Sequence, residues 1–117
     1  MTTDWKDEAF LLDILIAAKK AIEFASDMTW ADFQDDEKTL SAVVRQVQII
    51  GEAARNLSED TKRAHPDVAW PQIIAMRHRL VHDYSRINAR IVWDVIRNEL
   101  PALVAAIEPL VPPPDAV

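Results

Sequence analysis

The chain contains no cysteine among its 117 residues. Disulfide bonds, a thiolate nucleophile and a cysteine-ligated zinc site are therefore excluded. No apolar run approaches the roughly 20 residues that a membrane-spanning helix needs. The N-terminal segment is acidic, whereas a secretory signal peptide begins with basic and then apolar residues. Together these absences predict a cytoplasmic protein.

Glycine is almost absent as well, because Gly51 is the only one in the chain. Half of the residues are apolar, and no segment shows repeated alternation of β-branched and polar residues. These features predict an all-α fold in a single domain, which we place at residues 1–108. The prolines that follow predict an extended, proline-rich tail over residues 109–117.

Apolar residues recur three and four positions apart along most of the chain, which is typical of amphipathic helices. This spacing suits an up-and-down bundle of four to five helices. The predicted helices cover about residues 5–27, 36–57, 58–64, 70–83 and 88–108. Between the first two, residues 30–33 are expected to form a loop whose aromatic rings pack on the core. Pro101 should kink or restart the last helix, since proline removes a backbone hydrogen bond.

The formal net charge of −6 argues against a surface coated with nucleic-acid-binding cations. The charge is uneven, however: residues 1–60 hold 6 basic and 13 acidic side chains, and residues 61–117 hold 7 basic and 6 acidic ones. Four arginines but only one acid lie within residues 77–90. They could form a local patch that binds a polyanion, or they could pair with acids of the N-terminal half.

Arg77 stands where the fourth predicted helix should carry an apolar residue. Ile73 lies four residues before it and Val81 four residues after it, on one helical stripe. An arginine there is unfavourable unless it is paired, reaches to the surface or faces a second subunit. His82 follows, and histidine is the side chain that titrates near neutral pH. A permanent cation near a proton-transfer group suits chemistry at a phosphodiester.

Helix geometry limits how these two residues can meet. Residues five apart on a regular α-helix are separated by about 140° around its axis. Arg77 and His82 can converge if the helix unwinds at its C-terminal end, or across a two-fold axis to which each protomer contributes. His78 and His82 share a face but lack an adjacent glutamate and a clear third ligand, so we expect no metal site and no cofactor. Arg79 and Asp83 are expected to form a surface ion pair.

Residues 76–84 resemble the signature of the HEPN superfamily, in which an arginine and a polar residue precede a histidine by a few positions. The spacing of Arg77, four residues, His82, one residue and Tyr84 resembles the motif of HepT-like toxins more closely. The resemblance covers almost the whole chain. The other matching segments are residues 36–39, 49–54, 65–66, 70, 92–93 and 100–101.

The resemblance implies a dimeric helical bundle that acts as a metal-independent ribonuclease toxin, in a type VII-like pairing with a minimal nucleotidyltransferase antitoxin. By this resemblance Arg77 would bind the scissile phosphate, and His82 would move a proton during attack by the RNA 2′-hydroxyl. The antitoxin would silence the toxin by transferring AMP to Tyr84. His78 occupies a polar position that is often asparagine in close relatives, so it is an accessory candidate.

A second hypothesis belongs to a different class. The chain could be a non-catalytic helical module that binds a nucleotidyltransferase and presents nucleotide or substrate to it. The overall acidity favours this reading, and the compact cluster of arginine, histidine and tyrosine favours the ribonuclease. Both hypotheses predict a partner, but only the ribonuclease hypothesis predicts that RNA is cut.

Overall fold

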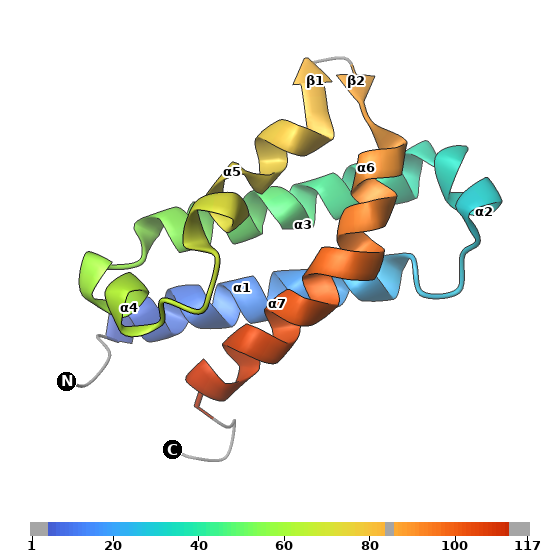
Figure 1. Ribbon diagram of the computed structural model, residues 1–117. Helices are drawn as coiled ribbons and strands as arrows, with labels where there is room; N and C mark the ends of the chain where they lie inside the picture. Colours follow the sequence, from blue (N-terminus) through green and yellow to red (C-terminus); the bar gives the residue numbers. More distant parts are fainter. Residues whose placement is uncertain (1–4, 84–85, 113–117) are drawn as a thin grey trace.

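A pair of long helices forms the base of the molecule. The computed structural model describes residues 5–83 and 86–112. Helices α1 (Trp5–Phe24) and α3 (Glu37–Asn56) lie side by side, and α5 (Trp70–Leu80) packs on α3 (Figure 1). The predicted all-α fold is therefore confirmed, with one small β-hairpin added. None of the helices in the described ranges is both long and apolar enough to cross a membrane.

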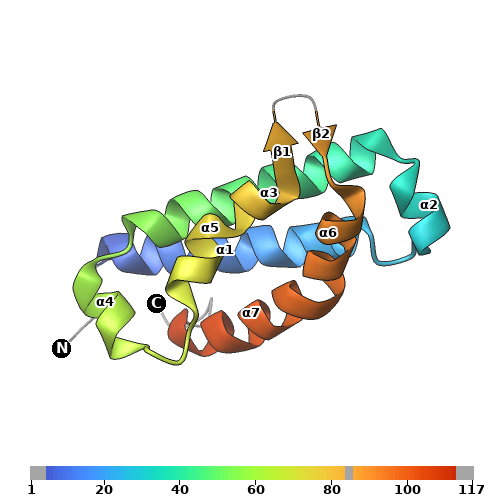
Figure 2. The same ribbon diagram turned by 45° about the horizontal axis from the view of Figure 1, so that its top comes forward.

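The C-terminal part of the chain covers the other side of α1. Helix α6 (Ala89–Asp94), the π-helical segment η1 (Val95–Glu99) and helix α7 (Leu100–Ile107) follow one another, and α1 lies between α3 and α7 (Figure 2). The π-helical segment ends just before Pro101, the position where a kink or restart was expected. A wider turn lets the chain accommodate a residue without an N–H group.

Two short helices occupy the connections, and one of them corrects a prediction. Residues 30–33 form most of helix α2 (Trp30–Gln34) rather than a loop, because Thr29 and Asp32 cap its first turn reciprocally. The predicted packing of its aromatic rings is confirmed. The ring centroid of Phe33 lies 5.1 Å from that of Trp93, and that of Trp30 lies 6.1 Å away from it.

Side-chain caps fix where the other helices begin. The Asp36 carboxylate accepts a hydrogen bond from the Thr39 amide at 2.9 Å, so α3 starts close to residue 36, where the second predicted helix begins. Asn88 caps α6 in the same way through the Ile91 amide. After α7, residues Glu108–Leu110 form a 3-10 turn, η2, so the first two residues of the segment expected to be extended, 109–110, are helical instead. Residues 113–117 lie outside the described ones.

The fourth predicted helix ends earlier than expected. Helix α5 stops at Leu80 rather than at residues 82–84, and the chain continues as strand β1 (Val81–Asp83). This strand pairs antiparallel with β2 (Arg86–Ile87) through Val81 opposite Ile87. The Leu80 carbonyl accepts a hydrogen bond from the Asn88 amide at 2.8 Å instead of continuing the helix. The hairpin therefore takes residues that sequence periodicity assigned to the helix.

The short helix α4 (Glu59–Ala64) is anchored to α1 by a buried carboxylate. Asp7 is only 3% exposed, and its oxygens accept hydrogen bonds from the Ser58 amide, the Ser58 hydroxyl and the Thr61 hydroxyl at 3.0, 2.6 and 2.6 Å. Burial alone would raise the pKa of Asp7, but these hydrogen bonds outweigh burial and hold the pKa below its ordinary value. The ionised form of Asp7 therefore stabilises the fold.

We expect Asp7→Asn to lower the free energy of unfolding by about 2 kcal/mol at pH 7, because charged hydrogen bonds are lost at a buried position. A lowered folded-state pKa means that this stabilisation is present above the unfolded value, near 3.8, and is lost as the pH falls below it. Urea unfolding at pH 7 and pH 3 checks this. The variant should differ from the wild type much less at pH 3. Asp13→Asn, an exposed position on the same helix, is the control. An equal deficit at both pH values would contradict the assignment.

Candidate functional site

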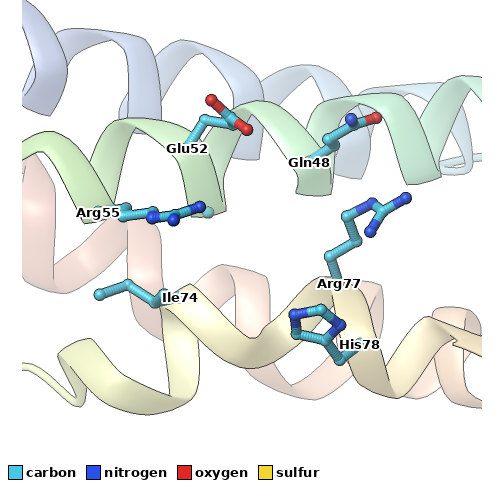
Figure 3. Close-up of a pocket in the computed structure, with 7 residues that line it drawn as sticks. Gln48, Glu52, Arg55, Ile74, Arg77 and His78 are labelled. Carbon is cyan, nitrogen blue, oxygen red and sulfur yellow. The ribbon is translucent and has the colours of Figure 1, made fainter.

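An open cleft of about 440 Å³ lies between helices α3 and α5. Figure 3 shows Arg77 reaching from α5 toward α3 and Arg55 lying along the edge of α3 that faces α5, whereas Gln48 and Glu52 point away from α5 in this view. The lining residues are Gln48, Gly51, Glu52, Arg55, Ile74, Arg77 and His78. Two of the residues singled out by the sequence, Arg77 and His78, therefore lie in one cleft. They come from the last turns of α5, directly before the hairpin.

Gly51 brings the two helices close together at this cleft. A Cβ atom at position 51 would lie 3.4 Å from the Ile74 carbonyl oxygen and 3.8 Å from that of Ile73. These are ordinary contact distances, so an alanine would fit, whereas a longer side chain would have to enter the cleft or separate the helices. The lone glycine of the chain therefore lies where α5 approaches α3 closely. Gly51 thus forms the narrow floor of the cleft, and the charged side chains lie around it.

Arg77 is half-buried and directs its guanidinium toward the Gln48 side of the cleft (Figure 3). No carboxylate of the described residues lies within 4 Å of this guanidinium. Of the three explanations for an arginine on an apolar stripe, pairing within these residues is therefore excluded. The side chain instead reaches the open cleft, where its charge is available to an anion.

The neighbouring arginines are already engaged in ion pairs. The Arg79 guanidinium binds the two carboxylate oxygens of Glu99 at 3.2 and 2.6 Å, so Arg79 pairs with η1; the side chain of Asp83, its expected partner, lies outside the described ones. Helix α5 packs close enough to this segment for the two side chains to meet. Arg90 lies 3.6 Å from Asp94 and stacks over Trp30. The interpretation that these arginines pair with N-terminal acids is thus wrong for Arg79 and Arg90.

His82 is placed by its backbone, as the middle residue of strand β1. Since α5 ends at Leu80, the 140° separation of a continuous helix does not apply between Arg77 and His82. Tyr84 lies outside the described residues. Within residues 5–83 and 86–112, no three side chains of histidine, cysteine, aspartate or glutamate gather as a metal site would require.

Sequence reasoning missed the part of the cleft that α3 supplies. Gln48, Glu52 and Arg55 follow one another at spacings of four and three, the repeat that places side chains on one helical face. Gly51 lies on that same face, so the signal was a polar stripe beside the only glycine. The apolar stripe of α3, which includes Val47 and Ile50, indicated only which face of this helix packs in the core.

Proteins similar to this chain carry names that agree with one another. The family model described as "Ribonuclease HepT-like" matches residues 14–110. A Methanocaldococcus jannaschii protein named "Putative RNase" is 42% identical over 103 residues, covering 88% of this chain and 85% of that protein. A Thermococcus cleftensis protein named "Probable ribonuclease HepT" is 37% identical over 101 residues, covering 86% and 92%. No solved structure gives a significant match. The chain belongs to the HepT-like ribonuclease family of the HEPN superfamily.

Proposed function

We propose that this chain is a metal-independent ribonuclease toxin in which Arg77 and His82 are the catalytic residues. Its family membership supports ribonuclease activity. The observation that carries the proposal is Arg77, a cation without a partner among the described residues, held in an open cleft beside the end of α5. His82 follows within two residues of that helix end. An available cation and a titratable side chain on adjoining elements suit phosphodiester cleavage.

The reaction needs a proton acceptor, a proton donor and a cation. His82 accepts the proton of the RNA 2′-hydroxyl as that oxygen forms a bond to phosphorus. The bond from phosphorus to the 5′-oxygen breaks, and a protonated group, for which His78 is the accessory candidate, returns a proton to the leaving oxygen. The products are a 2′,3′-cyclic phosphate and a 5′-hydroxyl. Arg77 binds the phosphate and stabilises the charge that develops on it.

The active form in this proposal is a homodimer. The cleft beside Arg77 is open, and its α5 wall runs directly into the hairpin that carries His82. A second copy placed on a two-fold axis at this end of α5 would bring two arginines and two histidines together. Each phosphodiester would then contact groups from both protomers. Arg77 and His82 would in this way converge across the two-fold axis, the second of the two arrangements that helix geometry allows.

The proposed partner is a minimal nucleotidyltransferase antitoxin. It would join the Tyr84 hydroxyl oxygen to the α-phosphorus of ATP, forming a phosphodiester to AMP and releasing pyrophosphate and a proton. The attached phosphate is anionic and lies two residues after His82 in the chain. It would compete with RNA for Arg77, by the same electrostatic logic that governs phosphorylation.

Expression in cells tests this pairing. We expect the wild-type chain, produced alone, to inhibit growth. Co-expression with a nucleotidyltransferase encoded beside its gene should restore growth and add the mass of one AMP to Tyr84, measured by mass spectrometry of the peptide. Tyr84→Phe should remain toxic in both cases, because its ring lacks the accepting oxygen.

Rescue of Tyr84→Phe as complete as that of the wild type would contradict control by AMP transfer. Absence of toxicity from unmodified wild-type protein, together with binding to the nucleotidyltransferase, would favour the alternative of a non-catalytic partner module. Western blots must show equal amounts of each chain, since a destabilised variant would also appear harmless.

A further inference from the structure

The wall of the cleft opposite Arg77 carries a second arginine. Arg55 extends from α3 toward the middle of the cleft, while Arg77 enters it from α5 (Figure 3). Arg55 is exposed, and no described carboxylate lies within 4 Å of it. Two arginines with no ionic partner in the described part of the chain therefore line one cleft, whereas Arg63 and Arg79 on neighbouring surfaces are held in ion pairs.

The helices place these two arginines on opposite sides of the narrow floor. Helices α3 and α5 run antiparallel across the contact between Gly51 and Ile74 (Figures 1 and 2). Arg55 is four residues beyond Gly51 toward one end of the cleft, and Arg77 is three residues beyond Ile74 toward the other. At 1.5 Å per residue, their backbones are offset by about 10 Å along the helices. This offset suits two successive anionic groups better than a single one.

Two further polar side chains of the cleft lining fit the sugar that joins two phosphates. Glu52 and Gln48 line the cleft from α3 and offer carboxylate and amide oxygens as hydrogen-bond acceptors. The 2′-hydroxyl of a ribose can donate a hydrogen bond to such an oxygen. Glu52 also limits the net charge of the lining to about +1 with His78 neutral, so binding depends on placed contacts rather than on a strongly positive field.

We propose that Arg55 binds a phosphate adjacent to the scissile phosphate that Arg77 holds, making the α3 wall of the cleft a substrate-binding subsite for RNA. This inference rests on the proposed ribonuclease function. It assigns Arg55 to binding and not to bond breaking. The residue should therefore matter for substrates with more than one phosphate and be dispensable for a substrate that contains only the scissile one.

The test compares Arg55→Ala with Arg45→Ala, which removes the same charge from an exposed position on the same helix. Binding is measured by fluorescence anisotropy with an unmodified oligoribonucleotide, and both changes are made in the His82→Ala background so that the strand keeps its 2′-hydroxyls and is not cleaved. Loss of one charge-assisted contact predicts about tenfold weaker binding for Arg55→Ala. The slope of log affinity against log salt should fall by about 0.7. Cleavage of an oligonucleotide should show a raised KM, and cleavage of a dinucleoside monophosphate should be unchanged.

Equal weakening by Arg45→Ala would overturn the proposal, since the effect would then be one of total charge. Unchanged binding by Arg55→Ala would overturn it as well, as would equal loss of cleavage on the dinucleoside monophosphate. If the wild type cleaves no RNA, the ribonuclease function fails, but the anisotropy comparison still decides whether Arg55 binds the strand. Circular dichroism must show that Arg55→Ala is folded, and Arg55→Lys, which keeps the charge, should retain most of the binding.

Discussion

Replacing Arg77 by alanine is expected to reduce RNA cleavage about 100- to 1000-fold while the protein stays folded. The magnitude is that of removing one group that stabilises charge developing in a transition state. Arg77 has no ion pair among the described residues, so its loss leaves no buried carboxylate unpaired. The kcat/KM for a defined RNA substrate measures the effect, and circular dichroism with thermal unfolding monitors the fold.

Arg79→Ala is the matched control for Arg77. It removes the same charge two residues later on α5, but its guanidinium is held by Glu99 outside the cleft. We expect a change of less than 1 kcal/mol in stability, since the pair is partly exposed, and cleavage within a few-fold of wild type. Similar losses of activity in both variants would mean that the general positive charge of this region matters, and that Arg77 has no special position.

The second large effect is expected at His82. His82→Ala should reduce the rate of cleavage about 100- to 10,000-fold, the range for removal of a general acid or base. The pH dependence of kcat/KM should also lose the limb that an imidazole contributes near neutral pH. Both quantities can be measured with one RNA substrate over a range of pH.

His78→Ala is the informative comparison for His82, because His78 is exposed in the cleft and only four residues away. Its loss should cost less than that of His82 if it only assists the leaving oxygen or orients the phosphate. A larger defect for His78→Ala than for His82→Ala would assign the proton acceptor to position 78. The catalytic assignment carried by the family motif would then be incorrect for this chain.

The bundle could be predicted from the sequence because local signals agreed with each other. Apolar spacing identified the long helices, and the predicted starts near residues 36 and 88 coincide with the caps that Asp36 and Asn88 form in the structure. The end of α5 could not be predicted in the same way. Val81 continues the four-residue spacing of Ile73 and Arg77 that is typical of one helical face, yet it pairs with Ile87 in the hairpin. A pairing between residues on two sides of a turn leaves no trace in helical periodicity.

The site was predictable on one wall only. The unusual placement of Arg77 and the family motif directed attention to α5, where Arg77 and His78 do line a cleft. The α3 wall depends on which helix packs against Gly51, and helix pairing is a tertiary property. The same limit explains the ion pair of Arg79. Its partner Glu99 is 20 residues away in the sequence, and no spacing within α5 indicates that η1 lies beside it.

The measurement that tests the central claim most directly is cleavage of RNA by purified protein with unmodified Tyr84 in the presence of EDTA. Total cellular RNA is incubated with wild type and with His82→Ala, beside single-stranded DNA. Our account predicts that wild type cuts RNA but not DNA, leaves 2′,3′-cyclic phosphate ends, and loses this activity in His82→Ala. Intact RNA with the wild-type protein, or equal cleavage by the variant, would contradict a metal-independent ribonuclease that uses His82.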